Sequence, residues 1–328
     1  MNQPGSHRLW ALLGIVAALA FASCAKMPRK VRSTATAPLT AAQMAELWTE
    51  PADIASRDLF HGPGGPALVP APGAAFDFVS KDTKGYSWGW DVKDASGLEW
   101  SVKYGPEAHS EVAASRLLWA IGYHQLPTYH VERWELRGGG EPGVKPPSRF
   151  RPKLPSQRRV AEWSWHENPF VGTQPYRGLL VMMRILNNWD LLDRNTAVID
   201  LDQASEGARR WYIVIDTGAS LGRTKLVPVS GTRSDVDDFE QQGFIKGLDA
   251  DGTVQFDDLG RFHRELFGDL SPADVRWTCE RLAKLTDTQW SDAFRAAGYE
   301  DDVAARFIRK IREKVAAGLA LGARPAGE

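Results

Sequence analysis

The chain has 328 residues, a formal net charge of −1, and 43% hydrophobic and 25% charged residues. A near-neutral chain with both charge signs interspersed lacks the basic surface that nucleic-acid binding requires, so no nucleic-acid partner is predicted. Its length suits one two-lobed domain or two small ones. No His or Cys cluster has the spacing of a zinc site.

The N-terminal residues 1–24 have the organisation of a secretory signal. Arg8 precedes an unbroken apolar stretch at 9–22, which is too short for a comfortable membrane span. The run Phe21-Ala-Ser-Cys24 resembles the lipobox of bacterial lipoproteins, in which the cysteine is acylated and becomes the mature N-terminus. This resemblance implies a lipid on Cys24 and a protein in the bacterial cell envelope, on the periplasmic or outer-membrane side. A plain signal peptide cut elsewhere and an uncleaved anchor are the alternatives.

The remaining thiol, Cys279, cannot form an internal disulfide once Cys24 is acylated, so an exported chain would be held together by its core. Cys279 lies among apolar residues at helical spacing, which predicts a buried small hydrophobe and not a nucleophile. Residues 25–75 are predicted to be a basic, flexible tether and an N-terminal leader, with an amphipathic helix that begins after Thr40.

Three strands and a helix are predicted to open the main domain, at residues 76–80, 86–92, 98–104 and 106–122. The apolar face of this helix is expected to cover the sheet. One or two further strands are predicted within 124–136. Residues 137–159 are rich in Gly, Pro, Lys and Arg without periodicity, which predicts an inserted loop with solvated cations.

A nearly apolar, buried helix is predicted to follow, with Thr173 as its cap and Pro175 in its first turn. The chain then enters a polar run, Asn187-Asn-Trp-Asp190, before the next apolar stretch. A buried helix leading straight into this run would hold it rigidly.

A β-hairpin is predicted next, because apolar runs at 197–199 and 211–215 flank a polar loop. Asp190 and Asn195 precede the first strand, and Asp216 leaves the second, so the three side chains are expected at one end of the hairpin. An Asp that can accept a hydroxyl proton, beside an Asn and an Asp that can bind Mg²⁺, is the set that phosphoryl transfer needs. The alternative is that all three residues only cap turns.

The spacing Asp190-x-x-x-x-Asn195, followed by Asp216-Thr-Gly, resembles the motifs of the protein-kinase-like superfamily. Within that superfamily the resemblance is greatest to its atypical members, the HipA-type and CotH-type kinases. The run 187–190 also resembles a group of uncharacterised bacterial envelope proteins. The kinase resemblance implies an α+β, two-lobed fold. Its antiparallel β N-lobe would occupy 76–170, including the inserted loop, and its mainly helical C-lobe would occupy 171–328.

The same resemblance implies a role for each candidate residue. Asp190 would be the catalytic base. Asn195 and Asp216 would hold Mg²⁺ or Mn²⁺, and Lys103, oriented by Glu111, would bind the phosphates of ATP.

Some of these assignments have open alternatives. The turn that carries Ser80, Thr83 and Gly85 would cover the nucleotide, but it has one glycine where protein kinases usually have three, so its hydroxyls would have to substitute for free backbone N–H groups. Glu107 is the second choice for the partner of Lys103, and Asp193 is the alternative base.

The sequence therefore predicts a membrane-anchored envelope lipoprotein with a kinase-like domain, acting as an ATP- and Mg²⁺-dependent phosphotransferase on an unknown acceptor. Because the envelope outside the inner membrane is poor in ATP, an unusual donor or a non-catalytic pseudokinase or other envelope binding module is the alternative. A third possibility is a glycan-binding or structural lipoprotein of another fold, suggested by the 13 tryptophans.

Overall fold

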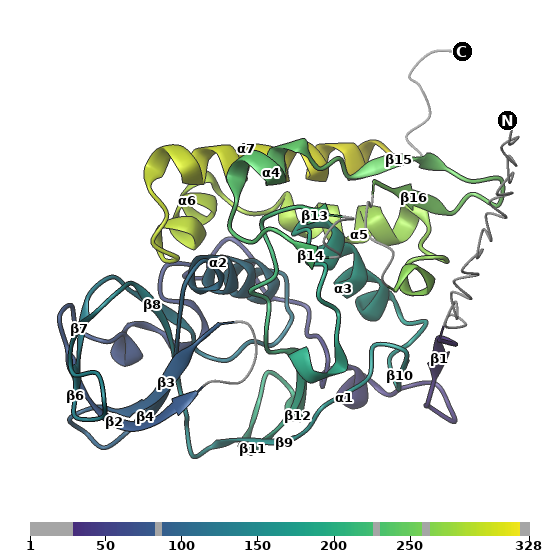
Figure 1. Ribbon diagram of the computed structural model, residues 1–328. Helices are drawn as coiled ribbons and strands as arrows, with labels where there is room; N and C mark the ends of the chain where they lie inside the picture. Colours follow the sequence, from purple (N-terminus) through teal and green to yellow (C-terminus); the bar gives the residue numbers. More distant parts are fainter. Residues whose placement is uncertain (1–28, 83–86, 226–229, 258–262, 322–328) are drawn as a thin grey trace, which may run out of the picture.

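The computed structural model describes residues 29–82, 87–225, 230–257 and 263–321, which form a β-rich lobe and a helical lobe (Figure 1). The predicted signal peptide with Cys24 lies outside the described residues, and so do Thr83 and Gly85. Among the described residues, none of the helices combines the length and the apolar character that crossing a membrane demands.

A curled seven-stranded sheet with the order β5-β8-β4-β3-β2-β6-β7 forms the β-rich lobe (Figure 1). Its strands are β2 (Ala75–Asp82), β3 (Gly89–Lys93), β4 (Glu99–Tyr104), β5 (Tyr129–Val131), β6 (Trp134–Arg137), β7 (Gly143–Lys145) and β8 (Ser148–Pro152). Neighbouring strands are antiparallel, apart from the parallel pair β2 and β6. The predicted antiparallel N-lobe is confirmed except at this one pair.

The predicted inserted loop is wrong, because most of that segment is strand. β7 pairs with β6, β8 lies between β4 and β5, and β9 (Gln157–Ala161) pairs with a strand of the later hairpin. The alternation Ser-Arg-Phe-Arg-Pro in β8 places Phe150 in the apolar interior of the sheet and turns Arg149 and Arg151 to the opposite face.

An aromatic cluster fills the interior of the curled sheet. Phe76, Trp90, Trp100, Trp134 and Phe150 are all buried there. The rings of Trp134 and Phe150 meet edge to face, with centroids 5.1 Å apart and planes at 88°. Three of the 13 tryptophans, Trp90, Trp100 and Trp134, therefore supply the core of this sheet.

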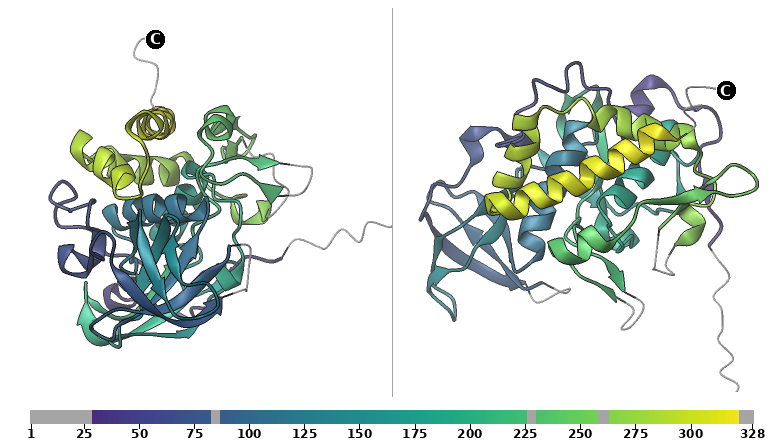
Figure 2. Two further views of the ribbon diagram at one scale, coloured as in Figure 1. Left: turned by 60° about the vertical axis from the view of Figure 1, so that its left-hand side comes forward. Right: turned by 90° about the horizontal axis from the view of Figure 1, so that it is seen from above.

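Helix α2 (Glu107–Ala120) lies between the two lobes and begins directly after Pro106, as predicted (Figure 2). One side of it contacts β4, β5 and β8. Its apolar residues, including Leu117, pack in the core of the helical lobe and not in the core of the sheet, so the expected orientation of its apolar face is wrong. Because both sides are covered, polar residues of α2 that face the sheet are also buried.

The helical lobe contains α3 (Gln174–Ile185), α4 (Val236–Gln241), α5 (Pro272–Leu282), α6 (Asp287–Arg295) and α7 (Asp301–Ala320). The side chains of Thr173, Ser271 and Thr286 each accept a backbone N–H three residues later and so start α3, α5 and α6. α7 lies across this lobe on the side away from the seven-stranded sheet (Figure 2). The predicted α+β, two-lobed architecture is confirmed.

Cys279 on α5 is fully buried, and burial raises the pKa of its thiol to about 12. The thiol therefore stays protonated at neutral pH, as expected for a small hydrophobe in the core.

The predicted hairpin is present as β11 (Thr196–Ser205) and β12 (Ala208–Val214), with β9 on the free edge of β11. Its strands extend well into the predicted polar loop, so that the turn falls at Glu206 and Gly207. Two smaller antiparallel pairs follow, β13 (Thr224–Lys225) with β14 (Ser230–Gly231) and β15 (Ile245–Leu248) with β16 (Val254–Phe256).

The N-terminal leader packs against both lobes. β1 (Arg32–Ser33), inside the predicted tether, pairs in parallel with β10 (Glu167–Asn168). Thr40 starts α1 (Ala41–Met44) through a capping box, which confirms the start of this helix although it has one turn only. The 3-10 turns η1 (Gly62–Gly64) and η2 (Pro66–Leu68) follow, and Leu47 and Leu59 are buried in the core of the helical lobe.

Candidate functional site

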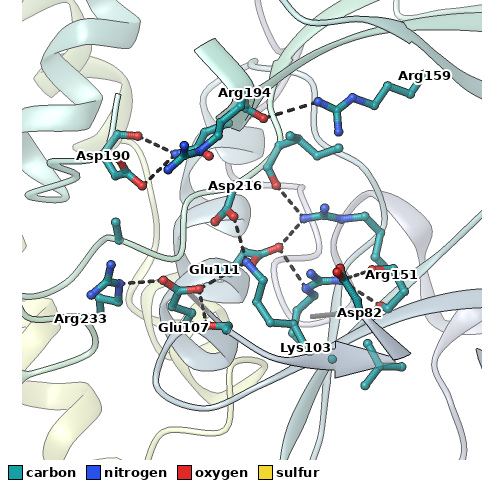
Figure 3. Close-up of a pocket in the computed structure, with 18 residues that line it drawn as sticks. Asp82, Lys103, Glu107, Glu111, Arg151, Arg159, Asp190, Arg194, Asp216 and Arg233 are labelled. Atoms are coloured by element: carbon teal, nitrogen blue, oxygen red, sulfur yellow. Dashed lines mark hydrogen bonds and ion pairs between the residues drawn. The ribbon is translucent and has the colours of Figure 1, made fainter. Parts of the chain in front are cut away.

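A cleft of about 260 Å³ is lined by residues of both lobes (Figure 3). Strands β3 and β4, helix α2 and strand β8 form one side. The other side is the end of the β11–β12 hairpin together with the turn η3 (Asp193–Asn195) that leads into it. The predicted site residues Lys103, Glu111, Asp190, Asn195 and Asp216 all line this cleft.

Lys103 on β4 lies at the centre of the charged network (Figure 3). Its Nζ is 2.9 Å from Asp216 Oδ2, 3.2 Å from Glu111 Oε2 and 3.4 Å from Glu107 Oε2. Burial alone would lower the pKa of Lys103, but the carboxylates of Glu111 and Asp216 outweigh it and raise the pKa. Lys103 is therefore a charged ammonium. It contacts both of the glutamates predicted as its partner, Glu111 and the second choice, Glu107.

Glu111 is 1% exposed and forms ion pairs with two arginines of β8 in addition to Lys103. Its Oε1 lies 3.0 Å from Nε of Arg149 and accepts a hydrogen bond from Arg151. The same nitrogen of Arg151 donates to the carbonyl of Ile215, at 2.9 Å. Burial opposes ionisation of Glu111, but Arg149, Lys103 and Arg151 outweigh it and lower its pKa. Arg151 therefore links α2 to the residue directly before Asp216.

The lowered pKa of Glu111 predicts a pH effect on stability. Its stabilising contribution is complete above the ordinary pKa of 4.5 and is lost as the pH falls through the lower folded-state pKa. In urea unfolding from about pH 6 to about pH 3, we expect the stability difference between wild type and Glu111→Gln to shrink on the acid side. A difference that stays constant over this range would contradict the prediction.

The hairpin end holds Asp190, Asn195 and Asp216 together. Nδ2 of Asn195 donates to Asp190 Oδ2 at 3.1 Å and to the Asp190 carbonyl at 2.8 Å. The carbonyl of Asn195 accepts the backbone N–H of Asp216 at 3.2 Å. Burial opposes ionisation of Asp216, but Lys103 holds its pKa at about 2. The structure thus brings together the three side chains that the sequence placed at one end of the hairpin.

Side-chain hydrogen bonds fix the run from Asn187 to Asp190. Asn187 has a left-handed backbone (φ 53°), a conformation that asparagine tolerates better than most residues. Its side chain donates to the carbonyl of Gly222 at 2.7 Å and accepts from the buried Lys314 at 2.6 Å. The side chain of Asn188 accepts the N–H of Asp190 at 3.1 Å. These bonds fix the backbone that carries Asp190.

Asp193, the alternative base, is engaged elsewhere. Its Oδ1 accepts the backbone N–H of Trp165 at 3.1 Å, and its Oδ2 lies 3.2 Å from Arg29. Asp190 lines the cleft, whereas Asp193 is not among the lining residues. This geometry favours Asp190 over Asp193 for contact with a bound ligand.

The nucleotide-covering turn is placed only in part. Ser80 on β2 is exposed and donates to Asp91 at 3.2 Å, and it does not line the cleft. Asp82, two residues or about 7 Å further along the same strand, does line it. Thr83 and Gly85 lie outside the described residues, while Ser87, after the turn, lines the cleft and donates to Glu107.

Several arginines of the cleft were not predicted. Arg149 and Arg151 were assigned to a solvated loop, although the alternation around Phe150 was a strand signal. Arg233 lies 2.7 Å from Glu107 and covers the ring of Trp189, and no local sequence pattern indicates this.

The charges that line the cleft are slightly cationic in balance. Among the described residues that line it, six side chains are basic and five are acidic: Lys103, Arg149, Arg151, Arg159, Arg194 and Arg233 against Asp82, Glu107, Glu111, Asp190 and Asp216. Focused in a cleft, such a balance favours an anionic ligand. The ionised carboxylate of Asp216 and the amide of Asn195 are hard oxygen donors of the kind that Mg²⁺ takes, so the residues present fit a magnesium ion.

The comparisons with known proteins find a distant structural likeness and no sequence match. No protein-family model matches the chain, and no curated protein matches it. A solved structure titled "Crystal structure of A Helicobacter pylori proinflammatory kinase CtkA" is similar over 76% of this chain and 97% of that chain, with 10% identity and a TM-score of 0.45. A likeness this distant does not carry activity from one protein to another.

Proposed function

We propose that the protein is a kinase-like phosphotransferase that uses ATP with Mg²⁺ or Mn²⁺ and is held in the bacterial cell envelope by a lipid on Cys24. The observation that carries the proposal is the position of Lys103, 2.9 Å from Asp216 and 3.2 Å from Glu111, in the cleft that Asp190 and Asn195 also line. The nucleotide and an acceptor with a hydroxyl group are the partners that this site implies.

Lys103 would bind the phosphates of the nucleotide, and Glu111 would keep its ammonium directed into the cleft. Asp216 and Asn195 would hold the metal ion, which when bound neutralises charge on the phosphate oxygens. The basic side chains around them suit a polyphosphate, because each one lowers the energy of placing several negative charges in the cleft.

Asp190 would accept the proton of the acceptor hydroxyl. The hydroxyl oxygen would bond to the phosphorus as the bond between phosphorus and the oxygen of the leaving nucleotide breaks. The amide of Asn195, 3.1 Å from Asp190 Oδ2, orients the carboxylate for this transfer. The hydrogen bonds from Asn187 to Gly222 and from the N–H of Asp190 to Asn188 also help to position the Asp190 carboxylate.

A non-catalytic kinase-like binding module is the second candidate, and one observation favours it. Lys103 is already neutralised by three carboxylates, and Glu107 is shared between Lys103 and Arg233. A lysine whose charge is compensated in this way needs no nucleotide phosphate to be stable.

Binding of nucleotide is tested by thermal unfolding of the soluble chain from Ala25 onward. With ATP and Mg²⁺ or Mn²⁺ at about 100 times Kd, we expect Tm to rise by about 5 °C. Asp216→Ala should abolish the metal-dependent part of this rise. Asp269→Ala is the matched control, because Asp269 is an exposed aspartate that pairs with Arg177 away from the cleft. No rise with any nucleotide would contradict the proposal and leave the binding module.

A further inference from the structure

Two histidines and a glutamate from distant parts of the chain meet outside the cleft. His166 lies directly before β10, and His263 and Glu265 lie at the turn η4 (Arg264–Leu266). His166 Nε2 is 2.8 Å from Glu265 Oε1, and His263 Nδ1 is 3.7 Å from the same oxygen. One nitrogen or oxygen of each residue lies within 4.8 Å of those of the other two.

These separations are close to those of a coordination shell. With bonds of about 2.1 Å to a tetrahedral ion, ligand atoms lie about 3.4 Å apart, so small side-chain movements would bring all three onto one centre. Imidazole nitrogens with one carboxylate form a donor set that suits zinc and similar transition metals, whereas the all-oxygen pair Asn195 and Asp216 suits magnesium.

The three side chains are largely shielded from water. His166 is 1% exposed, and the side chains of His263 and Glu265 are about one-fifth exposed. Metal binding requires His166 Nε2 without its proton and Glu265 as a carboxylate, so the ion would replace the hydrogen bond between these two groups.

We propose that His166, His263 and Glu265 bind one divalent transition-metal ion, with Zn²⁺ as the best match to their donor atoms. The ion clamps the segment before β10 to the turn before α5. None of its three ligands lines the cleft, so the site stands or falls separately from the phosphotransferase proposal.

The bound ion would fix the place where the segment of His166 meets β1 and η3. The carbonyl of His166 accepts the N–H of Arg32 in β1, at 2.9 Å, and the N–H of the preceding Trp165 donates to Asp193 in η3. About 100 residues separate His166 from His263, and a cross-link that closes so long a loop restricts the unfolded chain strongly. An exported chain whose Cys24 is acylated has no second thiol with which Cys279 could form such a cross-link.

The test measures metal content and stability of the full chain, purified in detergent without chelators. Elemental analysis should find one zinc per chain in wild type and loss of most of it in His166→Ala and His263→Ala. After chelator treatment, added Zn²⁺ at about 100 times Kd should raise Tm by about 5 °C in wild type and not in these variants. Co²⁺ should give a visible absorption band from nitrogen and oxygen ligands.

Two matched controls locate the ion. His61→Ala removes a partly exposed histidine that pairs with Asp58, and Asp216→Ala removes the proposed Mg²⁺ ligand of the cleft. Both variants should keep the zinc, because neither residue belongs to the cluster of His166, His263 and Glu265. Should His166→Ala fail to fold, the more exposed His263→Ala and Glu265→Gln carry the test. Metal-free wild type with no rise in Tm on adding Zn²⁺ or Co²⁺ would overturn the proposal, as would undiminished zinc in His263→Ala.

Discussion

Replacement of Glu111 by alanine is expected to lower the free energy of unfolding by about 3–5 kcal/mol, because it strands buried cations. Glu111 is 1% exposed, and its two oxygens lie against Lys103, Arg149 and Arg151. Burial and the neighbouring Arg149 lower the pKa of Arg151 to about 10, in keeping with a place where a charge is poorly solvated. Without the carboxylate, the nearest acidic neighbours of Lys103 would be Asp216 and Glu107, and Arg149 would lose its carboxylate partner.

The loss is measured by urea unfolding at neutral pH. Glu141→Ala is the matched control: this glutamate also pairs with more than one cation, Lys81 and Lys145, but its side chain is 55% exposed, so the change should stay within about 0.5 kcal/mol. Glu111→Gln keeps the shape and one acceptor oxygen and should fall between the two. An effect of Glu111→Ala no larger than that of Glu141→Ala would show that water, and not the glutamate, stabilises the three cations.

Features that depend on neighbouring residues were predictable from the sequence. The caps Thr173, Ser271 and Thr286 start their helices because each bonds to a backbone N–H only three residues away. The gathering of Asn195 and Asp216 follows from the hairpin, since pairing of Thr196 with Val214 leaves the flanking residues at the same end. Local periodicity and turn chemistry are sufficient for such features.

Features that depend on distant segments were not predictable. Arg149 becomes a partner of Glu111 because β8 inserts between β4 and β5, and nothing near Arg149 in the sequence specifies that neighbour. The apolar face of α2 is visible in the sequence, but whether it meets the sheet or the helical lobe depends on packing of the whole domain. The meeting of His166 and His263 is of the same kind, since a search for short ligand spacings cannot find residues so far apart.

Replacement of Asp190 by asparagine is expected to reduce phosphoryl transfer by about 10²–10⁴-fold while nucleotide binding persists, because the amide cannot accept the hydroxyl proton. Asparagine has nearly the same shape, so the contact with Asn195 and the backbone bonds of the loop should remain. The rate of transfer from ATP to an acceptor mixture or to water measures the first effect. The nucleotide-dependent rise in Tm measures the second.

Asp193→Asn is the control that decides between the two candidate bases. Asp193 accepts hydrogen bonds from Trp165 and Arg29 and does not line the cleft, so its replacement should change the stability of the loop more than the chemistry. A large loss of rate in Asp193→Asn with an active Asp190→Asn would reverse the assignment of the base. If wild type binds Mg²⁺ and ATP but transfers no faster than Asp190→Asn, the compensated charges around Lys103 serve ligand binding alone, and the protein is a kinase-like binding module.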